Sequence, residues 1–346
     1  MLYRFICVFF VAMFASAFLA SAQTDKSDSV VVNKRLTTLE AIVNKLPKIG
    51  GVVNARYQYS SEEGNYNVGK NGFDIRRLQI NMQGNVMKNL TYYFQLECAG
   101  SPRILDAYAR WSLNKYLEIK AGQYKVMYTL ENPYAVIDLE TVENSQSIKA
   151  LVTEFQGVKC SGRDIGIAVN GNFFQRNGFN LVEYSLNLLN GNQYNVDNNT
   201  NKDFVGTLCV NPVKPLRLVL SFYDGEYGPQ SSKIKRTLTS VGMKFDDRKL
   251  LVRSEYISAK TDVTRSVGFY LTTGYYLTPK LQPVLKYDSY KTDRSNSLSQ
   301  ATALSAGINY WLTSNSKVQC FYTLKSFNDT SKKDVNTIAA QYLLGF

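Results

Sequence analysis

Basic residues recur in the middle of segments whose residues alternate between apolar and polar types. In an extended segment successive side chains point to opposite faces, so each base shares its face with other polar residues. Arg and Lys on a face in contact with water attract anions and bind oxyanions through charge-assisted hydrogen bonds. The residues placed in this way are Arg56, Arg77, Arg110, Lys120, Arg217, Lys244, Arg253 and Lys286.

Carboxylates occur in the same phase as these bases, which weakens the case for a purely basic surface. The acids are Glu97, Asp106, Glu118, Glu183 and Glu255. Several can pair with a base, as Arg253 and Glu255 would on one face of a strand. Any water-filled interior carries charges of both signs, and this plainer interpretation is sufficient for most of these residues.

Composition excludes several other kinds of chemistry. The chain has a formal charge of +12 and contains no histidine, which removes Ser-His-Asp hydrolysis and His-ligated metal sites. Its cysteines are far apart and form no CxxC motif, which argues against a metal site. The positive charge is spread along the chain without a dense cluster, unlike a nucleic-acid-binding surface. We expect no catalytic residue, no metal, no cofactor and no nucleic-acid partner.

The segments that must position the bases have the pattern of membrane-spanning strands. Every second residue from Ile338 to Phe346 is apolar, while Gln341 and Thr337 occupy the other phase. About ten residues of tilted strand cross a bilayer. An edge strand of a soluble sheet is the alternative for this segment taken alone. An Arg or Lys facing lipid at mid-membrane costs about 2 to 4 kcal/mol, so the mid-segment bases must face an interior.

The interruptions between segments also alternate in length. Short breaks such as 114–116 and 246–248 lie between longer polar ones such as 191–202 and 291–300. Short turns on one side and long loops on the other are typical of transmembrane barrels. The sequence therefore predicts an all-β fold, a transmembrane antiparallel β-barrel of about sixteen strands with a water-filled lumen.

The N-terminal region predicts export and a separate short segment. Arg4 precedes an apolar run that ends near Ala20-Ser21-Ala22, so residues 1–22 have the pattern of a signal peptide. Residues 23–48 contain apolar residues at heptad spacing, which predicts a periplasmic helical or coiled-coil segment, with a loosely ordered linker as an equal alternative. The barrel would then span residues 49–346 in a bacterial outer membrane.

The break at 124–162 is the longest in the barrel region and is unusually apolar, with Tyr128, Tyr134 and Phe155. Apolar side chains in a loop need a surface to pack against. We expect this loop to fold inward and constrict the pore. The alternative is an extracellular flap that packs on its neighbours.

Several motifs together resemble one known family. They are FDIRRLQINMQGNV (73–86), LDAYARW (105–111), EIKAGQYKVMYTLEN (118–132), RDIGIAVNG (163–171), VEYSLNLLNGN (182–192), LLVRSEYI (250–257) and GFYLTTGYYLTPKLQPVLKYD (268–288). In order and spacing they are similar to the phosphate-selective porin O and P family, in a Tyr-rich and Asn-rich style like that of Bacteroidetes-type outer membranes. The similarity extends over nearly all of the chain after the signal segment.

This resemblance implies a sixteen-stranded trimeric channel whose basic lining draws oxyanions past a constriction. By motif match, Arg76 and Arg77 of IRR, Asp106 of LDAY and Lys125 of GQYK resemble constriction and lining positions of the family. The mixture of acids and bases and the lack of a dense arginine ladder depart from the family pattern. Adjacent residues of a regular strand point to opposite faces, so Arg76 and Arg77 can both reach the lumen only if one lies in a bulge or at the rim.

The sequence predicts a porin for passive diffusion of small solutes, with a preference for anions such as phosphate. Expected partners are small anions, outer-membrane lipid and lipopolysaccharide, and two further copies in a homotrimer. A general or carbohydrate-type diffusion porin is one alternative, since Tyr93, Tyr108 and Tyr124 could form part of an aromatic track. A structural or adhesive surface protein is another. No enzymatic activity is expected.

Overall fold

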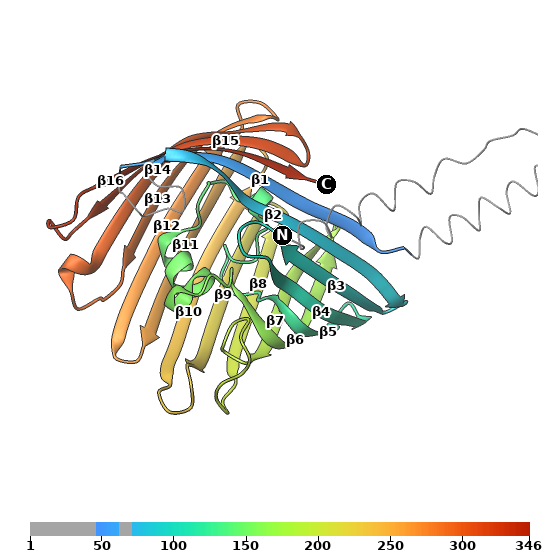
Figure 1. Ribbon diagram of the computed structural model, residues 1–346. Helices are drawn as coiled ribbons and strands as arrows, with labels where there is room; N and C mark the ends of the chain where they lie inside the picture. The colour runs from blue at the N-terminus through green and yellow to red at the C-terminus, as the bar shows by residue number, and fades with distance from the viewer. Residues whose placement is uncertain (1–45, 62–70) are drawn as a thin grey trace, which may run out of the picture. The chain divides into compact units, whose positions relative to one another are not determined.

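The computed structural model describes residues 46–61 and 71–346, and within them sixteen strands form one closed sheet (Figure 1). Each strand pairs antiparallel with its neighbour in the sequence, and β1 pairs with β16 to close the ring. Closure leaves no unpaired sheet edge, which a membrane requires because lipid offers no hydrogen-bond partners. The predicted all-β antiparallel barrel is confirmed.

The strands are of the length needed to cross a bilayer at a tilt. They are β1 (Lys48–Ser60), β2 (Asn71–Met87), β3 (Leu90–Glu97), β4 (Arg103–Asn114), β5 (Leu117–Lys125), β6 (Arg163–Arg176), β7 (Phe179–Leu189), β8 (Asp203–Val213), β9 (Leu216–Tyr227), β10 (Ile234–Asp246), β11 (Leu250–Thr261), β12 (Thr264–Tyr275), β13 (Leu281–Lys291), β14 (Gln300–Thr313), β15 (Ser316–Phe327) and β16 (Val335–Gly345).

The last residues of the chain take part in the closure. The amide of Gly51 donates to the carbonyl of Phe346 at 2.9 Å, and the amide of Phe346 donates back to Gly51 at 3.1 Å. Alternation within β16 follows the sequence pattern, since Ile338 is 49% exposed on the outer face whereas Gln341 and Leu343 are buried on the inner face. The apolar phase therefore faces outward, toward lipid.

One connection differs from all others in length and structure. Residues 126–162, here called the long loop, link β5 to β6 and contain the short helices η2 (Val136–Asp138), α3 (Gln146–Ile148), η3 (Lys149–Thr153) and η4 (Phe155–Gly157). A further turn of helix, η5 (Ser297–Ser299), lies between β13 and β14. None of the helices in the described part of the chain is long and apolar enough to span a membrane.

The predicted signal peptide at 1–22 and nearly all of the predicted helical segment at 23–48 lie outside the described residues. The barrel's first strand begins at Lys48, the last residue assigned to that segment from the sequence. Residues 47–346 form one compact unit.

Candidate functional site

The long loop lies inside the barrel, where it contacts strands far apart around the ring (Figure 1). Thr207 of β8 donates to the loop carbonyl of Met127 at 2.7 Å. Glu255 of β11 accepts from the loop amide of Leu130 at 2.8 Å, and Lys317 of β15 donates to a loop carbonyl at 2.6 Å. Contacts with β8, β11 and β15 require the loop to extend across the interior and narrow it.

Apolar packing holds the loop against one part of the inner wall. Ile148 and Leu151 of the loop are buried in a cluster with Val205, Leu238 and Ile257 of the strands. Burial of one such side chain is worth about 1.5 to 3 kcal/mol. Part of the interior is therefore a packed core, formed by the loop that was expected to fold inward, and only the remainder can be the water-filled lumen that the sequence predicted.

A row of basic residues crosses the inner wall from β9 to β13. Cα pairing places Arg217 opposite Lys244, Lys244 opposite Arg253, Arg253 opposite Thr272, and Thr272 opposite Lys286. We call these four bases the basic row. Directly opposed residues have Cβ atoms about 5 Å apart, and like charges at that distance repel each other. The row therefore needs anionic groups beside it.

The long loop supplies those groups at one end of the row. The side chain of Arg253 is fully buried, with Glu140 of the loop at 2.7 Å and Glu131 at 3.5 Å. Lys286 is also buried and donates to a loop carbonyl at 3.4 Å. The expected position of Arg253 on the open bore is thus corrected, as is its expected pairing with Glu255, which instead accepts loop backbone amides. This end of the basic row anchors the loop.

At the other end of the basic row, Arg217 and Lys244 line a cavity of about 360 Å³, which adjoins a second cavity of about 450 Å³. Both are lined partly by the short turns of the barrel, and Glu183 belongs to both. Their charged lining residues are Lys115, Lys120, Lys214, Arg217, Lys244, Arg248, Glu118, Glu183 and Asp246. Six bases against three acids leave this wall net positive.

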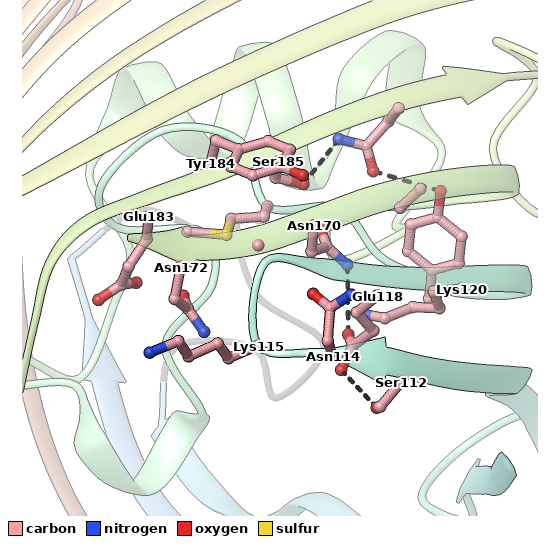
Figure 2. A pocket seen from close by; sticks show the side chains of 15 residues that line it. Ser112, Asn114, Lys115, Glu118, Lys120, Asn170, Asn172, Glu183, Tyr184 and Ser185 are labelled. Atoms are coloured by element: carbon pink, nitrogen blue, oxygen red, sulfur yellow. Dashed lines mark hydrogen bonds between the residues drawn. The ribbon is translucent and has the colours of Figure 1, made fainter. Parts of the chain in front are cut away.

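Charge pairing in the cavities is incomplete. Glu183 makes two hydrogen bonds to Arg217, at 3.0 and 2.9 Å. Lys244 lies 3.5 Å from Glu140 of the loop and is 18% exposed. Figure 2 shows the first cavity, where the side chains of Lys115, Asn172 and Glu183 lie near one another. Lys115, in the turn after β4, has no carboxylate within ion-pair distance among the described residues. It is one of the bases available to a solute.

A bulge decides how the adjacent residues Arg76 and Arg77 are placed. Asn54 of β1 lies opposite Arg77, and the next residue, Ala55, lies opposite Ile75. Arg76 is therefore an extra residue in β2, and the alternation of faces is interrupted there. Both guanidinium groups consequently reach charged partners on the inner side.

Arg76 and Arg56 hold the loop from the side opposite the basic row. Arg56 makes two hydrogen bonds to Asp74, at 3.1 and 2.7 Å, and a third to Glu143 of the loop at 3.2 Å. Arg76 lies 2.8 Å from the same Glu143. Burial acts to raise the pKa of Glu143, but Arg76, Lys149 and Arg56 outweigh it and hold the pKa at about 2. Glu143 thus stays ionised well into the acid range.

The base of the loop is held by a third group of charges. Lys125 and Arg163, at the two ends of the loop, are Cα partners. Asp106 accepts two bonds from Arg163, at 3.1 and 2.8 Å, and one from the Lys125 amide at 2.9 Å. Arg77 is nearby, 3.7 Å from Glu97. Sequence reasoning missed Arg163, although it begins the RDIG motif where the long break ends.

Arg110 and Lys120 lie on the wall formed by β4 and β5. Arg110 is 3.7 Å from a carboxylate of β5 and keeps 40% of its side chain exposed. The Lys120 ammonium lies over the rings of Tyr108 and Tyr124, at 5.0 and 5.2 Å from their centroids. Tyr93 stacks on Tyr108 with centroids 5.3 Å apart. The structure therefore brings together the three tyrosines that were considered as an aromatic track.

Sequence reasoning also missed the loop acids Glu131, Glu140 and Glu143, because no periodic pattern marks a side chain in an irregular loop. Within 46–61 and 71–346, no three Cys, Asp or Glu side chains gather as a metal site would require.

Comparison with protein families gives one match that agrees with this geometry. The model of the phosphate-selective porin O and P family matches residues 48–249, which is more than half of the chain. No curated protein sequence matches the chain significantly.

Solved structures with the same fold are numerous, but their sequences are distant. The anion-selective porin from Comamonas acidovorans has a TM-score of 0.68 at 12% identity, covering 87% of this chain and 99% of its own. The outer membrane channel DcaP of Acinetobacter baumannii has a TM-score of 0.63 at 13% identity, covering 87% and 97%. OmpT of Vibrio cholerae, in a trimer form, has a TM-score of 0.62 at 9% identity, covering 87% and 99%. At these identities the likeness establishes the fold alone.

Proposed function

Because the chain belongs to the phosphate-selective porin O and P family, a family of bacterial outer-membrane channels, we propose that this porin conducts small anions and prefers phosphate-type oxyanions. Diffusion is passive, down the gradient of the solute. Proteins of this family and fold are typically channels without enzymatic activity.

The observation that carries the anion preference is the open end of the basic row. Arg217 and Lys244 stand beside Lys214 and Arg248 in a cavity whose lining holds only two acids, Glu183 and Asp246. A net positive wall next to the narrowed interior raises the local concentration of anions and lowers that of cations.

Conduction requires that each contact be weak enough to release the solute. Arg217 shares its charge with Glu183, and Lys244 shares its charge with Glu140. An entering oxyanion would gain charge-assisted hydrogen bonds from these bases. Each bond would be weakened because the base is already partly neutralised by a carboxylate of the protein. We propose that the solute passes from the narrowed region beside the loop along Arg217 and Lys244 to the short-turn mouth. Of the other predicted lining residues, Arg110 and Lys120 would add to this path and Arg77 pairs with Glu97 of β3. The remaining ones contact the loop or its base.

The zero-current potential of the purified protein in planar bilayers under a KCl gradient tests the proposal. We expect a potential of the sign given by chloride preference, and a reduction of the chloride current when phosphate is added at constant ionic strength. Cation preference would contradict the proposal and leave a porin of ordinary type. Absence of any channel would contradict the assignment as a porin.

One observation supports a second candidate, a channel for neutral sugars. Stacked tyrosines can bind the apolar faces of sugar rings, and Tyr93, Tyr108 and Tyr124 are in contact on one wall. Swelling of proteoliposomes in neutral sugars would distinguish the two candidates. If the protein is a sugar channel, the Tyr108→Ala variant should lose selectivity among sugars. If it is an anion channel, the same variant should keep the reversal potential of the wild type.

Assembly and targeting are part of the proposal. A homotrimer is supported by family membership and by the trimer form of the similar OmpT structure. Residues 1–22 are proposed to be a signal peptide, residues 23–48 a periplasmic segment, and the outer face a surface in contact with outer-membrane lipid and lipopolysaccharide.

A further inference from the structure

The outer face of β11, β12 and β13 carries aromatic and basic residues at one repeated spacing. On β11 the exposed Tyr256 is followed four residues later by the exposed Lys260. On β12 the exposed Phe269 is preceded by four residues by the exposed Arg265. Both bases lie toward the long-loop side of the barrel, near the turn that joins β11 to β12.

The third strand repeats this spacing. On β13 the exposed Tyr287 is followed four residues later by the half-buried Lys291. Strand pairing turns the repeats into two levels. Tyr256 lies opposite Phe269, and the ring centroids of Phe269 and Tyr287 are 6.4 Å apart.

The basic level is equally well aligned. Lys260 lies directly opposite Arg265, and Lys291 lies opposite Val267, two residues along β12 from Arg265. The backbone amide of Arg294, in the next loop, donates to the carbonyl of Arg265 and brings a fourth base to the same edge. We call Lys260, Arg265, Lys291 and Arg294 the outer basic edge.

The charges of this edge are only weakly compensated by the described residues, where Lys291 interacts at longer range with Asp293. In the described part of the chain, none of the four bases has a carboxylate within ion-pair distance. The carboxylates of the neighbouring loops are otherwise engaged, since Asp262 accepts the amide of Lys235 and Asp293 accepts bonds from Ser295. Like charges directly opposite each other on a sheet are destabilising, so a bound external anion would offset the repulsion between Lys260 and Arg265.

The height of the edge indicates what that anion is. Aromatic girdles lie at the membrane interface. Phe269 lies in the middle of β12, whereas Tyr275 lies at its short-turn end. The ten residues from Tyr275 to Arg265, at about 3.3 Å each and tilted by about 45°, place Arg265 about 23 Å from Tyr275, near the opposite edge of an apolar band about 25 Å tall. That is the level of lipid headgroups, on the side of the barrel that carries the long loops.

We propose that the outer basic edge binds a lipid of the outer leaflet through phosphate groups on its sugar headgroup, with the acyl chains lying against Tyr256, Phe269 and Tyr287. Arg265 donates a planar pair of hydrogen bonds to one phosphate, and Lys260 and Lys291 add compact positive charges on either side. The inference concerns the lipid-facing surface and does not depend on which solute the channel conducts.

The test compares the triple variant K260Q/R265Q/K291Q with the wild-type protein. Its matched control is K202Q/K332Q/K333Q, which removes three exposed bases from other loops on the same side of the barrel, outside both the outer basic edge and the long loop. Binding of a diphosphorylated lipid A is measured by native mass spectrometry, with the dephosphorylated glycolipid as the second ligand. We expect the triple variant to bind lipid A about tenfold more weakly than the wild type, and the control variant to bind it as the wild type does, which would show that position matters. We expect the wild type to bind the dephosphorylated lipid more weakly than lipid A, which would show that phosphate matters.

Three results would overturn the inference. They are equal lipid A binding by the triple variant and wild type, equal binding of the dephosphorylated lipid, and full competition by millimolar inorganic phosphate, which would indicate a site for free anions. Conductance is recorded on the same samples. If the triple variant equals the wild type in both conductance and lipid binding, the lipid site alone is rejected. If the wild-type channel shows no anion preference, only the proposed solute preference is rejected.

Discussion

The two ends of the basic row have similar residues and opposite surroundings. At one end Arg253 is fully buried between Glu131 and Glu140 of the long loop. At the other end Arg217 and Lys244 are partly exposed and line a cavity together with Lys214 and Arg248. A residue of the basic row therefore anchors the loop where the loop covers it. Where the loop does not cover it, the residue forms part of the channel surface.

Removal of the loop should abolish this difference and have the largest effect. Deletion of Ile137–Ile148 takes away Glu140 and Glu143, so Arg253 and Arg56 would be exposed to solvent. We expect single-channel conductance to rise several-fold and anion preference to increase, measured in planar bilayers. An unchanged conductance would mean that the loop does not set the narrowest part of the pore.

Charge reversal at the open end should change selectivity with less effect on conductance. In Lys244→Glu a carboxylate would stand beside Glu140 and Asp246, which lie within 4 Å of the ammonium in the wild type. We expect the reversal potential to move toward cation preference. Lys333→Glu, an exposed loop residue of the same type, is the control. Equal shifts in both variants would show that overall charge, and not the basic row, sets the preference.

Neutralising the covered end should instead affect the loop. Arg253→Gln leaves Glu131 and Glu140 without their shared base, and breaking a buried pair in this way typically costs about 3 to 5 kcal/mol. We expect faster hydrogen exchange of the loop amides and frequent conductance fluctuations. A reversal potential that shifts as far as in Lys244→Glu, with a quiet loop, would contradict the assignment of Arg253 as an anchor.

A smaller effect is expected from Glu143→Gln, because Glu143 keeps 38% of its side chain exposed and its ion pairs are partly screened. The variant loses contacts with both Arg56 and Arg76. We expect a modest increase in current noise at neutral pH, with the mean conductance little changed. Noise equal to that of Arg253→Gln would show that the two sides hold the loop equally.

The last prediction concerns acid pH, where protonation of Glu143 should weaken its hold on the loop. The pKa of Glu143 is held at about 2, below the usual value near 4.3, so its stabilising contribution is complete above about pH 4.3 and is lost as the pH falls toward 2. We expect quiet currents from pH 7 to about pH 5 and increasing fluctuations below about pH 4. Glu143→Gln should lack this change. An identical acid response in the variant would assign the titration to another group.

The sequence by itself determined the barrel and its position in the membrane. A period of two is a local property of an extended chain, so alternation from Ile338 to Phe346 was sufficient to indicate which side chains face lipid. The mid-strand bases followed from the same rule, because charge cannot face lipid. The need for a bulge near Arg76 and Arg77 could also be stated, since two adjacent arginines violate the alternation.

Only the tertiary structure decided what the inward bases do. The inner wall is covered by a loop that is far from most of those bases in the sequence, and no periodicity marks Glu131, Glu140 or Glu143. Arg253 and Lys244 look equivalent in the sequence because both occupy inward positions in neighbouring strands. They differ because Glu131 and Glu140 of the loop enclose Arg253 completely, whereas Lys244 meets the loop on one side only and stays 18% exposed at the edge of the cavity.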